Sequence, residues 1–172
     1  LETVQGAKVG LMGTMENMIG KESIPTERTT PESLDLQALL AQMRDAGCTH
    51  VIMEVSSHAI CLERVGGLIY DVAAFTNLTE DHLDFHKTME NYCDAKAILF
   101  TRCRKAVGNL DDSWYSRMFA NCTCPIVSTS VSGEATLMAR DLELLSDGIT
   151  FTAVCEDAKV QVKLPIPGKF TV

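Results

Sequence analysis

Three short runs dominated by apolar residues, separated by segments long enough to form helices, most constrain the fold of this chain. The runs lie at residues 51–55, 71–77 and 105–109. Apolar runs of this length are typical of strands that are buried on both faces of a parallel sheet. Residues 30–47 and 88–103, in contrast, have apolar residues at helical spacing. The alternation therefore predicts an α/β fold, with a mainly parallel sheet flanked by helices.

The residue pattern changes near residue 130. Three alternating segments follow, ATLMARDLELL, GITFTAV and KVQVKL, separated by the turn signals SDG and EDA. Alternating segments with short turns predict an antiparallel meander. We therefore expect an α/β layer over residues 1–130, a small antiparallel sheet attached to it over residues 131–164, and the start of a linker at residues 165–172. One more short strand is expected within residues 8–14.

The helix expected at residues 30–47 carries its own start and stop signals. Thr30 can cap the amino end, Pro31 suits the first turn, and Gly47 suits the exit. The face that turns inward is expected to consist of Leu36, Leu39, Leu40 and Met43.

Composition indicates one compact, soluble domain. The chain has 172 residues, of which 46% are hydrophobic, and this is enough for one core. Fifteen Lys and Arg against 23 Asp and Glu give a net charge of −8, which disfavours nucleic acid and anionic membranes as partners. No apolar run approaches the roughly 18 residues of a membrane span, and residues 1–20 do not resemble a signal peptide. We therefore expect a cytoplasmic protein.

The seven cysteines are scattered, odd in number and without a C-x-x-C motif. Reduced thiols in a cytosol are the expected state. Cys122 and Cys124 alternate in a segment that leads into a strand, and this placement argues against a metal role for them.

Gly13 and the IGK segment at residues 19–21 invite comparison with a phosphate-binding loop. Such a loop has four residues between its glycines and then Lys followed by Ser or Thr, because its amides curl around one phosphate. Here six residues intervene, and Glu22 follows Lys21. The spacing therefore excludes this motif.

Polar side chains follow two of the expected parallel strands. Glu54 ends the first strand, and Asn77, Asp81 and His82 follow the second. Ligands gather at the carboxyl ends of strands in open parallel sheets. A carboxylate within an apolar run needs a cation, and for Glu54 this is either an Arg or Lys side chain, for example Arg64, or a metal ion; the sequence leaves both open.

Lys96 falls within the apolar stripe of the helix expected at residues 88–103. The stripe consists of Met89, Tyr92, Cys93, Leu99, Phe100 and Cys103. Such a lysine usually extends to the surface or forms an ion pair. A desolvated lysine, however, has a lowered pKa, and its neutral amine can take up carbon dioxide to form a carbamate. Glu54, His82 and a carbamate on Lys96 would together suit Mg, although imidazole is an unusual Mg ligand.

Several segments of the chain match one known family. They are TTPES (29–33), EVSSHAI (54–60), RVGG (64–67), FTNLTEDHLDFHKTMENYCDAKAILF (75–100), NLDD (109–112) and LPIPGKF (164–170). In this order they resemble the Mur ligases, and most closely the MurE type, the UDP-N-acetylmuramoyl-tripeptide synthetases. The resemblance implies an ATP- and Mg-dependent amide ligase of peptidoglycan synthesis. Its reaction adds diaminopimelate or lysine to UDP-N-acetylmuramoyl-L-alanyl-D-glutamate through an acyl phosphate.

The resemblance also implies roles for single residues. Lys96 resembles the carbamylated lysine of the family, and Glu54 and His82 resemble ligands of the Mg ions beside the ATP γ-phosphate. Positions that hold the UDP-muramoyl dipeptide are matched by Thr29, Thr30, Ser56 and Arg64. Asn77 and Asp81 lie in the same active-site loop. Two positions depart from some members, Arg28 before the threonines and Leu62 where a Gln can contact substrate.

Family members also have an N-terminal domain that binds UDP, a phosphate loop, and a C-terminal domain that binds the incoming amino acid. The resemblance therefore implies that residues 1–172 are a partial central ATPase domain without its phosphate loop, expected to be inactive alone. The parent enzyme is expected to be a monomer.

Two other classes of protein remain open from the residues. A metal-dependent hydrolase could use the DHLDFH segment as its His and Asp cluster, but only four histidines occur in the chain. A non-catalytic module that binds the UDP-muramoyl substrate or partner proteins is the third class. Metal and nucleotide binding would distinguish them.

Overall fold

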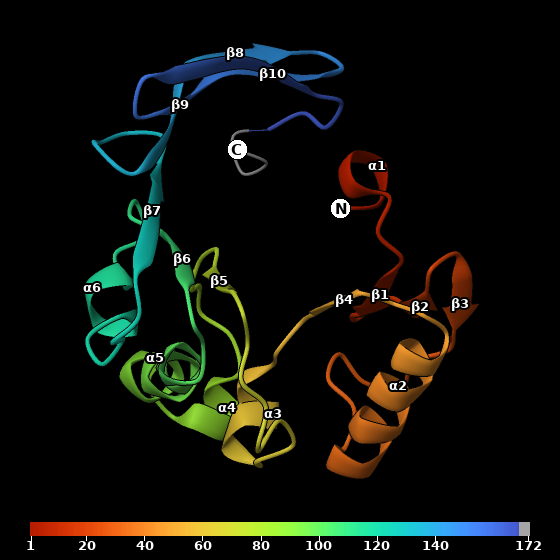
Figure 1. The fold of residues 1–172 in the computed structure, drawn as a ribbon. Helices are drawn as coiled ribbons and strands as arrows, with labels where there is room; N and C mark the ends of the chain where they lie inside the picture. The colour runs from red at the N-terminus through yellow and green to blue at the C-terminus, as the bar shows by residue number, and fades with distance from the viewer. Residues whose placement is uncertain (169–172) are drawn as a thin grey trace. The chain divides into compact units, whose positions relative to one another are not determined.

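A computed structural model of the chain describes residues 1–168, apart from the side chains at positions 3 and 4. The chain divides into two compact units, at residues 1–68 and 69–172. The structure contains a four-stranded and a six-stranded sheet, with helices beside them (Figure 1). The predicted α/β fold, with a mainly parallel sheet flanked by helices, is therefore confirmed. Residues 169–172 of the expected linker lie outside the described residues.

The first unit is built around the four-stranded sheet. Its elements are α1 (Glu2–Gln5), β1 (Val9–Met12), β2 (Asn17–Ile19), β3 (Glu22–Ile24), α2 (Ser33–Asp45), β4 (His50–Met53) and α3 (Ser57–Cys61). The strand order is β3-β2-β1-β4, in which β1 is antiparallel to β2 and parallel to β4. Because β1 and β4 are parallel, their carboxyl ends lie at the same edge of the sheet.

Helix α2 buries the face that its sequence predicts. Leu36, Leu39 and Met43 are buried, whereas Leu40, the fourth residue of the predicted face, is half-buried. The side chain of Met43 lies so close to Gly10 that a Cβ there would be 2.4 Å from Met43 Sδ. The helix therefore packs on the β1 strand at this glycine.

The predicted amino end of this helix is wrong by two residues. The helix begins at Ser33, with Glu32 rather than Thr30 as the capping residue, and Pro31 precedes it. The Thr30 hydroxyl instead bonds to the chain that leaves β4. At the other end Gly47 has φ 82°, the left-handed conformation that commonly ends a helix.

Burial of the β4 strand on both faces is also wrong. Val51 and Ile52 are 38% and 51% exposed. Within the first unit, β4 is an edge strand that pairs only with β1, and α2 packs over β1. The exposed Val51 and Ile52 of β4 therefore do not line the core of this unit.

The second unit is built around the six-stranded sheet. Its elements are β5 (Ala73–Phe75), α4 (Leu83–His86), α5 (Met89–Ala97), the 3-10 helix η1 (Ile98–Thr101), β6 (Ala106–Asn109), α6 (Tyr115–Met118), β7 (Ile126–Ser130), β8 (Leu137–Leu145), β9 (Gly148–Cys155) and β10 (Ala158–Leu164). The strand order is β10-β9-β8-β7-β6-β5. The strands of residues 1–130 thus belong to two hydrogen-bonded sheets, one in each unit.

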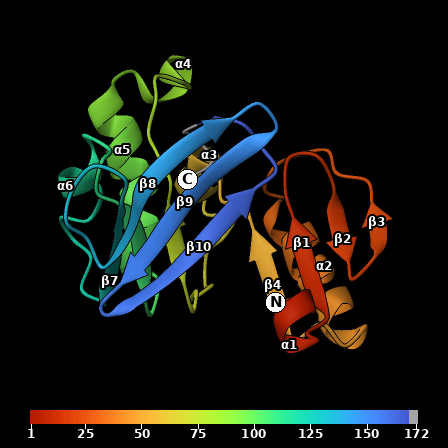
Figure 2. The same ribbon diagram turned by 90° about the horizontal axis from the view of Figure 1, so that it is seen from above.

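Strands β5 to β8 pair in parallel, whereas β8, β9 and β10 pair antiparallel. Figure 2 shows the three long antiparallel strands side by side. The antiparallel meander expected after residue 130 is therefore present, and β8 joins it to the parallel strands. Among the described residues, no helix is both long and apolar enough to cross a membrane.

The core of the second unit is aromatic. Helices α5 and α6 cover β5 and β6 through a cluster that includes Phe75, Tyr92, Phe100 and Phe119. Phe119 contacts both other phenylalanines, at ring-centroid distances of 6.1 Å to Phe75 and 4.5 Å to Phe100. In β5 the burial alternates, because β5 is the edge strand and turns only one face to this cluster.

Gly108 on β6 leaves room for this aromatic cluster, and this generates a test. A Cβ at this position would lie 2.4 Å from Phe119 Cε2 and 2.8 Å from Tyr115 Cε2. We expect Gly108→Ala to lower the free energy of unfolding by about 1–3 kcal/mol, as overpacked cores do. Urea unfolding of both proteins measures the difference. Gly133→Ala is the control, because its nearest neighbour would be Ser130 Oγ at an ordinary 3.6 Å. Equal stability of the two variants would contradict the prediction.

Candidate functional site

Glu54 follows β4 directly, and its carboxylate is held by Thr14, which follows β1. The Thr14 backbone N–H and hydroxyl donate to Glu54 Oε2 at 3.2 and 2.5 Å. Thr14 Oγ1 lies 3.0 Å from Thr29 Oγ1 as well. A Cβ at Gly13 would come within 3.1 Å of Glu54 Oε1, so the glycine leaves space for the carboxylate. The parallel pairing of β1 with β4 therefore places these groups side by side.

Thr30 ties the segment before α2 to the segment after β4. Its hydroxyl donates to Glu54 O at 2.9 Å and accepts from Ser56 N at 3.0 Å. Thr30 is only 1% exposed, so water does not compete for these bonds. Ser56 Oγ in turn caps α3 by accepting from Ala59 N at 3.2 Å. The structure thus brings Thr29, Thr30, Glu54 and Ser56 together in the first unit.

Arg64 lies in the same unit, with Glu32 as its ion-pair partner. Arg64 Nη2 is 2.9 Å from Glu32 Oε1, and its side chain is 12% exposed. Arg28 Nε lies 3.5 Å from the same oxygen. The alternative in which Arg64 neutralises Glu54 is therefore wrong, because Glu32 takes that place. Among the described residues, Arg64 Nε is buried without a hydrogen-bond partner.

Asp81 and His82 form a tight pair at the start of α4 in the second unit. Asp81 Oδ1 accepts from His82 N at 2.7 Å, and His82 Nδ1 lies 3.5 Å from the same oxygen. The backbone of His82 is left-handed, with φ 54°, a conformation uncommon for residues with a side chain. Such residues cluster at functional sites. The His82 ring meets the Tyr92 ring edge-on, at 5.9 Å between centroids.

Lys96 lies one helical turn after Tyr92 on α5. Its Nζ is 5.4 Å from the centroid of the Tyr92 ring, within cation–π distance. Burial lowers the pKa of Lys96, and the Asp81 carboxylate partly offsets this shift. Burial, and then Asp81, raise the pKa of Tyr92. The structure therefore gathers Asp81, His82, Tyr92 and Lys96 within the second unit.

The second histidine of DHLDFH has a different environment. His86 is 6% exposed and stacks on Tyr92, with ring centroids 4.9 Å apart. Its ring is buried and contributes to packing. Across the side chains that the structure describes, no group of three or more His, Cys, Asp or Glu has the geometry to hold a metal ion.

Two side chains at the end of β6 anchor the loop that carries Asp81 and His82. Asn109 Nδ2 donates to Thr76 O at 2.9 Å. Asp112 accepts with both carboxylate oxygens, Oδ2 from Leu78 N at 2.9 Å and Oδ1 from Trp114 N at 2.8 Å. The loop is therefore fixed to the neighbouring parallel strand at two points.

Sequence reasoning assigned no role to these anchors or to Thr14. The signal was present, because NLDD follows an expected strand directly and Gly13 and Thr14 close another. Asn77, which was predicted as a site residue, lies exposed between the two anchored residues of the loop. The structure therefore places Asn77 in the same loop as His82.

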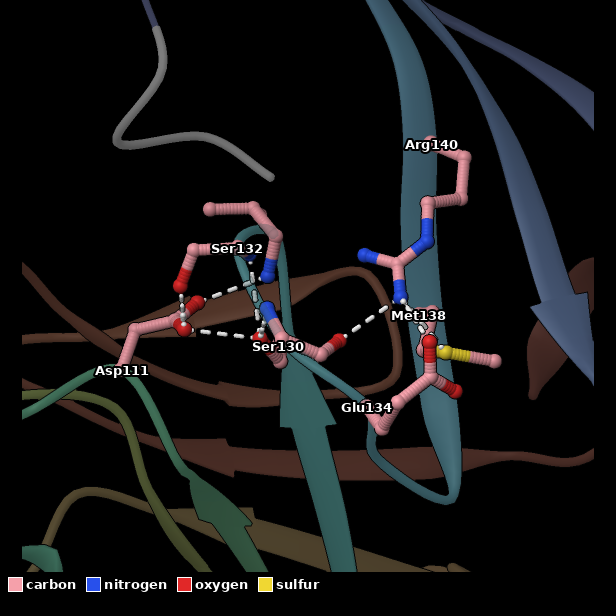
Figure 3. Close-up of polar contacts among 8 residues, drawn as sticks. Asp111, Ser130, Ser132, Glu134, Met138 and Arg140 are labelled. Carbon is pink, nitrogen blue, oxygen red and sulfur yellow. Dashed lines mark hydrogen bonds and ion pairs between the residues drawn. The ribbon is translucent and has the colours of Figure 1, made fainter.

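The other carboxylate of NLDD holds the connection from β7 to β8 (Figure 3). Asp111 accepts from Ser130 Oγ and Val131 N, both at 2.7 Å, and also from Ser132 Oγ. Burial alone would raise the pKa of Asp111, but these hydrogen bonds outweigh it and lower the pKa. Arg140 of β8 binds the turn that follows. Adjacent carboxylates thus organise two different loops at one edge of the sheet.

Comparison with known proteins identifies the family of this chain. The model of the Mur ligase middle domain matches residues 1–172. A UDP-N-acetylmuramoyl-L-alanyl-D-glutamate–2,6-diaminopimelate ligase of Caldanaerobacter subterraneus subsp. tengcongensis is 44% identical over 169 residues, which cover 98% of this chain and 35% of the relative. The ligase of the same name from Corynebacterium glutamicum is 47% identical, over 97% of this chain and 34% of the relative.

A solved structure of a ligase with that name superposes with a TM-score of 0.89 at 32% identity. The match covers 98% of this chain and 36% of the solved chain. The chain thus spans about a third of the length of the relatives that it matches.

The two roles of NLDD can be separated by exchanging one carboxylate at a time. In Asp112→Asn, one acceptor oxygen becomes an amide nitrogen, so one of the Leu78 and Trp114 amides loses its partner. We expect exchange of the amide that loses its partner to accelerate about tenfold, the effect of roughly one hydrogen bond. Hydrogen–deuterium exchange followed by NMR measures this. Asp111→Asn is the matched control, expected to affect the Val131 amide instead. Acceleration of the same amides in both variants would show that the anchors are not separate.

Proposed function

Because the chain belongs to the Mur ligase family, we propose that it forms the middle domain of an ATP-dependent ligase that adds diaminopimelate to UDP-N-acetylmuramoyl-L-alanyl-D-glutamate. One observation carries this proposal: ligases with this name are 44% and 47% identical to the chain along nearly its whole length. The proposed reaction belongs to peptidoglycan synthesis, and because it consumes ATP we assign it to the cytoplasm. Lysine in place of diaminopimelate is the second candidate for the added amino acid.

The proposed reaction needs Mg. The three proposed ligands, Glu54, His82 and Lys96, differ in how well they suit this metal. Glu54 offers a carboxylate whose second oxygen, Oε1, accepts no bond from Thr14. Carboxylate oxygens are the ligands that Mg prefers. His82 offers an imidazole, which suits Mg less well. Lys96 can contribute only after conversion to a carbamate, which replaces a cation with oxygen donors. When bound, Mg offsets the negative charge that develops on the phosphate groups.

The surroundings of Lys96 favour that conversion. Carbamate formation needs a neutral amine, and the lowered pKa of Lys96 increases its neutral fraction. The ring of Tyr92, at 5.4 Å from Nζ, and the Asp81 carboxylate stabilise the ammonium form and so oppose the effect of burial. The modified side chain would be an anion beside Asp81, so it needs a cation to persist. We therefore propose that Lys96 is carbamylated in the working enzyme, and that Glu54 and His82 are Mg ligands, as the resemblance to the Mur ligases implies.

We assign the substrate to the residues around the Thr30 hydroxyl. Thr29, Thr30, Ser56 and Arg64 are proposed to hold the UDP-muramoyl dipeptide. The buried Arg64 Nε has a free donor, which supports a role in binding an anion. Asn77 and Asp81 are proposed to act in the loop that presents His82. In the proposed reaction the substrate carboxylate takes the γ-phosphoryl group of ATP, and the amine then displaces phosphate. These residues orient the carboxylate for both steps.

Replacement of Lys96 tests the central assignment. In the full-length enzyme, Lys96→Ala should lower kcat at least about 10²-fold, because the ligand and the charge compensation are lost together. Short-chain carboxylates should partly restore activity by replacing the carbamate. The control is Lys87→Ala, since Lys87 donates to Asp84 O on the nearby α4 and is exposed. Ligase assays, with circular dichroism to check the fold, give the readout. Near-normal turnover of Lys96→Ala would remove this residue from the mechanism.

Thr14 allows the role of Glu54 to be tested without removing the carboxylate. Thr14→Val keeps the shape of the side chain but removes the hydroxyl that donates to Glu54 Oε2. We expect the Mg concentration for half-maximal activity to rise about tenfold, as for other residues that orient a metal ligand. Thr14→Ser keeps the hydroxyl and should behave like the unaltered enzyme. An unchanged Mg requirement in Thr14→Val would argue against Glu54 as a metal ligand.

A further inference from the structure

Three cysteine sulfurs lie in contact at the amino ends of β6 and β7, away from the residues of the proposed site. Cys103 Sγ is 3.5 Å from Cys124 Sγ, and Cys122 Sγ is 3.4 Å from Cys124 Sγ. The three are partly buried against the aromatic core of the second unit. Cys124 therefore has two thiol neighbours, one near in sequence and one 21 residues away.

The chain segments around Cys103 and Cys124 are already aligned side by side. Cys103 precedes β6 and Cys124 precedes β7, and these two strands pair in parallel from Ala106 and Ile126 onward. Just before them, Ala106 N donates to Pro125 O at 3.0 Å. Joining these cysteines requires their sulfurs to close from 3.5 Å to the roughly 2.05 Å of an S–S bond.

We propose that Cys103 and Cys124 are a site of reversible oxidation, at which a peroxide joins the two thiols in a disulfide that links the amino ends of β6 and β7. The proposal is independent of the proposed ligase function. Cys122 is the competing partner of Cys124. A bond between them would close a ring through a single intervening residue, which leaves little freedom to reach the specific torsion angles of a disulfide.

The reaction balances with one peroxide and two thiols. The Cys124 sulfur attacks one peroxide oxygen, the O–O bond breaks, and water leaves, so that Cys124 becomes a sulfenic acid. The Cys103 sulfur then attacks the Cys124 sulfur, and the hydroxyl group leaves with a proton as a second water. Two electrons pass from the two thiols to the peroxide.

The environment of these thiols makes the reaction slow. Burial, with the neighbouring thiols, raises the pKa of Cys103 to about 12. Burial likewise raises the pKa of Cys122. Thiolates, not thiols, are the nucleophiles, so few molecules react at neutral pH at any moment. Exposed Cys61 and Cys155 must therefore be removed before the internal pair can be followed cleanly.

Disulfide mapping tests the proposal on the full-length protein with Cys61→Ser and Cys155→Ser. The reduced protein is treated with hydrogen peroxide for hours, free thiols are alkylated, and tryptic peptides are analysed by mass spectrometry. Trypsin cleaves after Arg102 and Arg104, and this separates Cys103 from the peptide that carries Cys122 and Cys124. We expect a cross-linked pair of peptides in which fragmentation places the bond at Cys124, and we expect dithiothreitol to reverse it.

Variants of single cysteines identify the partners. Cys122→Ser should keep the cross-link, whereas Cys124→Ser and Cys103→Ser should abolish it. Because the analysis of the protein with all three cysteines stands by itself, a variant that fails to fold does not prevent the test. A bond from Cys122 to Cys124, a bond from Cys103 to Cys122, or full alkylation of Cys103 and Cys124 after peroxide treatment would each overturn the proposal.

Discussion

Backbone amides that leave a sheet need new acceptors, and in this protein side chains supply them at the carboxyl ends of the strands. After β4 the Thr30 hydroxyl accepts from Ser56 N, and beside β6 the Asp112 carboxylate accepts from Leu78 N. An unpaired buried amide costs about 1–3 kcal/mol, so these bonds fix the loops that follow. The conformation of these loops thus depends on hydrogen bonds from other segments as well as on contacts within each loop, such as that of the Asp81 carboxylate with His82 N.

The aromatic core of the second unit explains why a lysine is half-buried on α5. The helix must turn Tyr92 and Phe100 toward the aromatic core, and Lys96 lies between them on that face. Its charge is compensated by the Tyr92 ring and by the Asp81 carboxylate, which opposes the effect of burial on its pKa. The Asp81 carboxylate in turn accepts a hydrogen bond from the backbone N–H of His82, whose backbone is left-handed. A lysine in such a setting has lost hydration without gaining a close ion pair, which distinguishes it from a surface residue.

The sequence predicted the inner face of α2 well, because apolar spacing of 3.6 residues leaves few alternatives for a helix with one covered side. It predicted the helix start poorly. Thr30 suits a cap by local rules, yet its hydroxyl bonds to Glu54 O and Ser56 N, groups more than 20 residues away. The exposed Ile52 has the same explanation, because an apolar strand does not reveal whether it will be central or at an edge. Thr14 and Asp112 escaped notice since each acts on another segment.

The sequence by itself determined the α/β class, the antiparallel meander, and the residue types at the strand ends, because periodicity and strand-end chemistry are local properties. The family segments predicted Glu54, His82 and Lys96 as site residues, and these roles stay predictions. Only the tertiary structure decided that Glu32 pairs with Arg64, that Thr14 holds Glu54, and that Cys103 meets Cys124. Each of these contacts joins residues far apart in the chain, and the pairing of strands, which no local pattern specifies, brings them together.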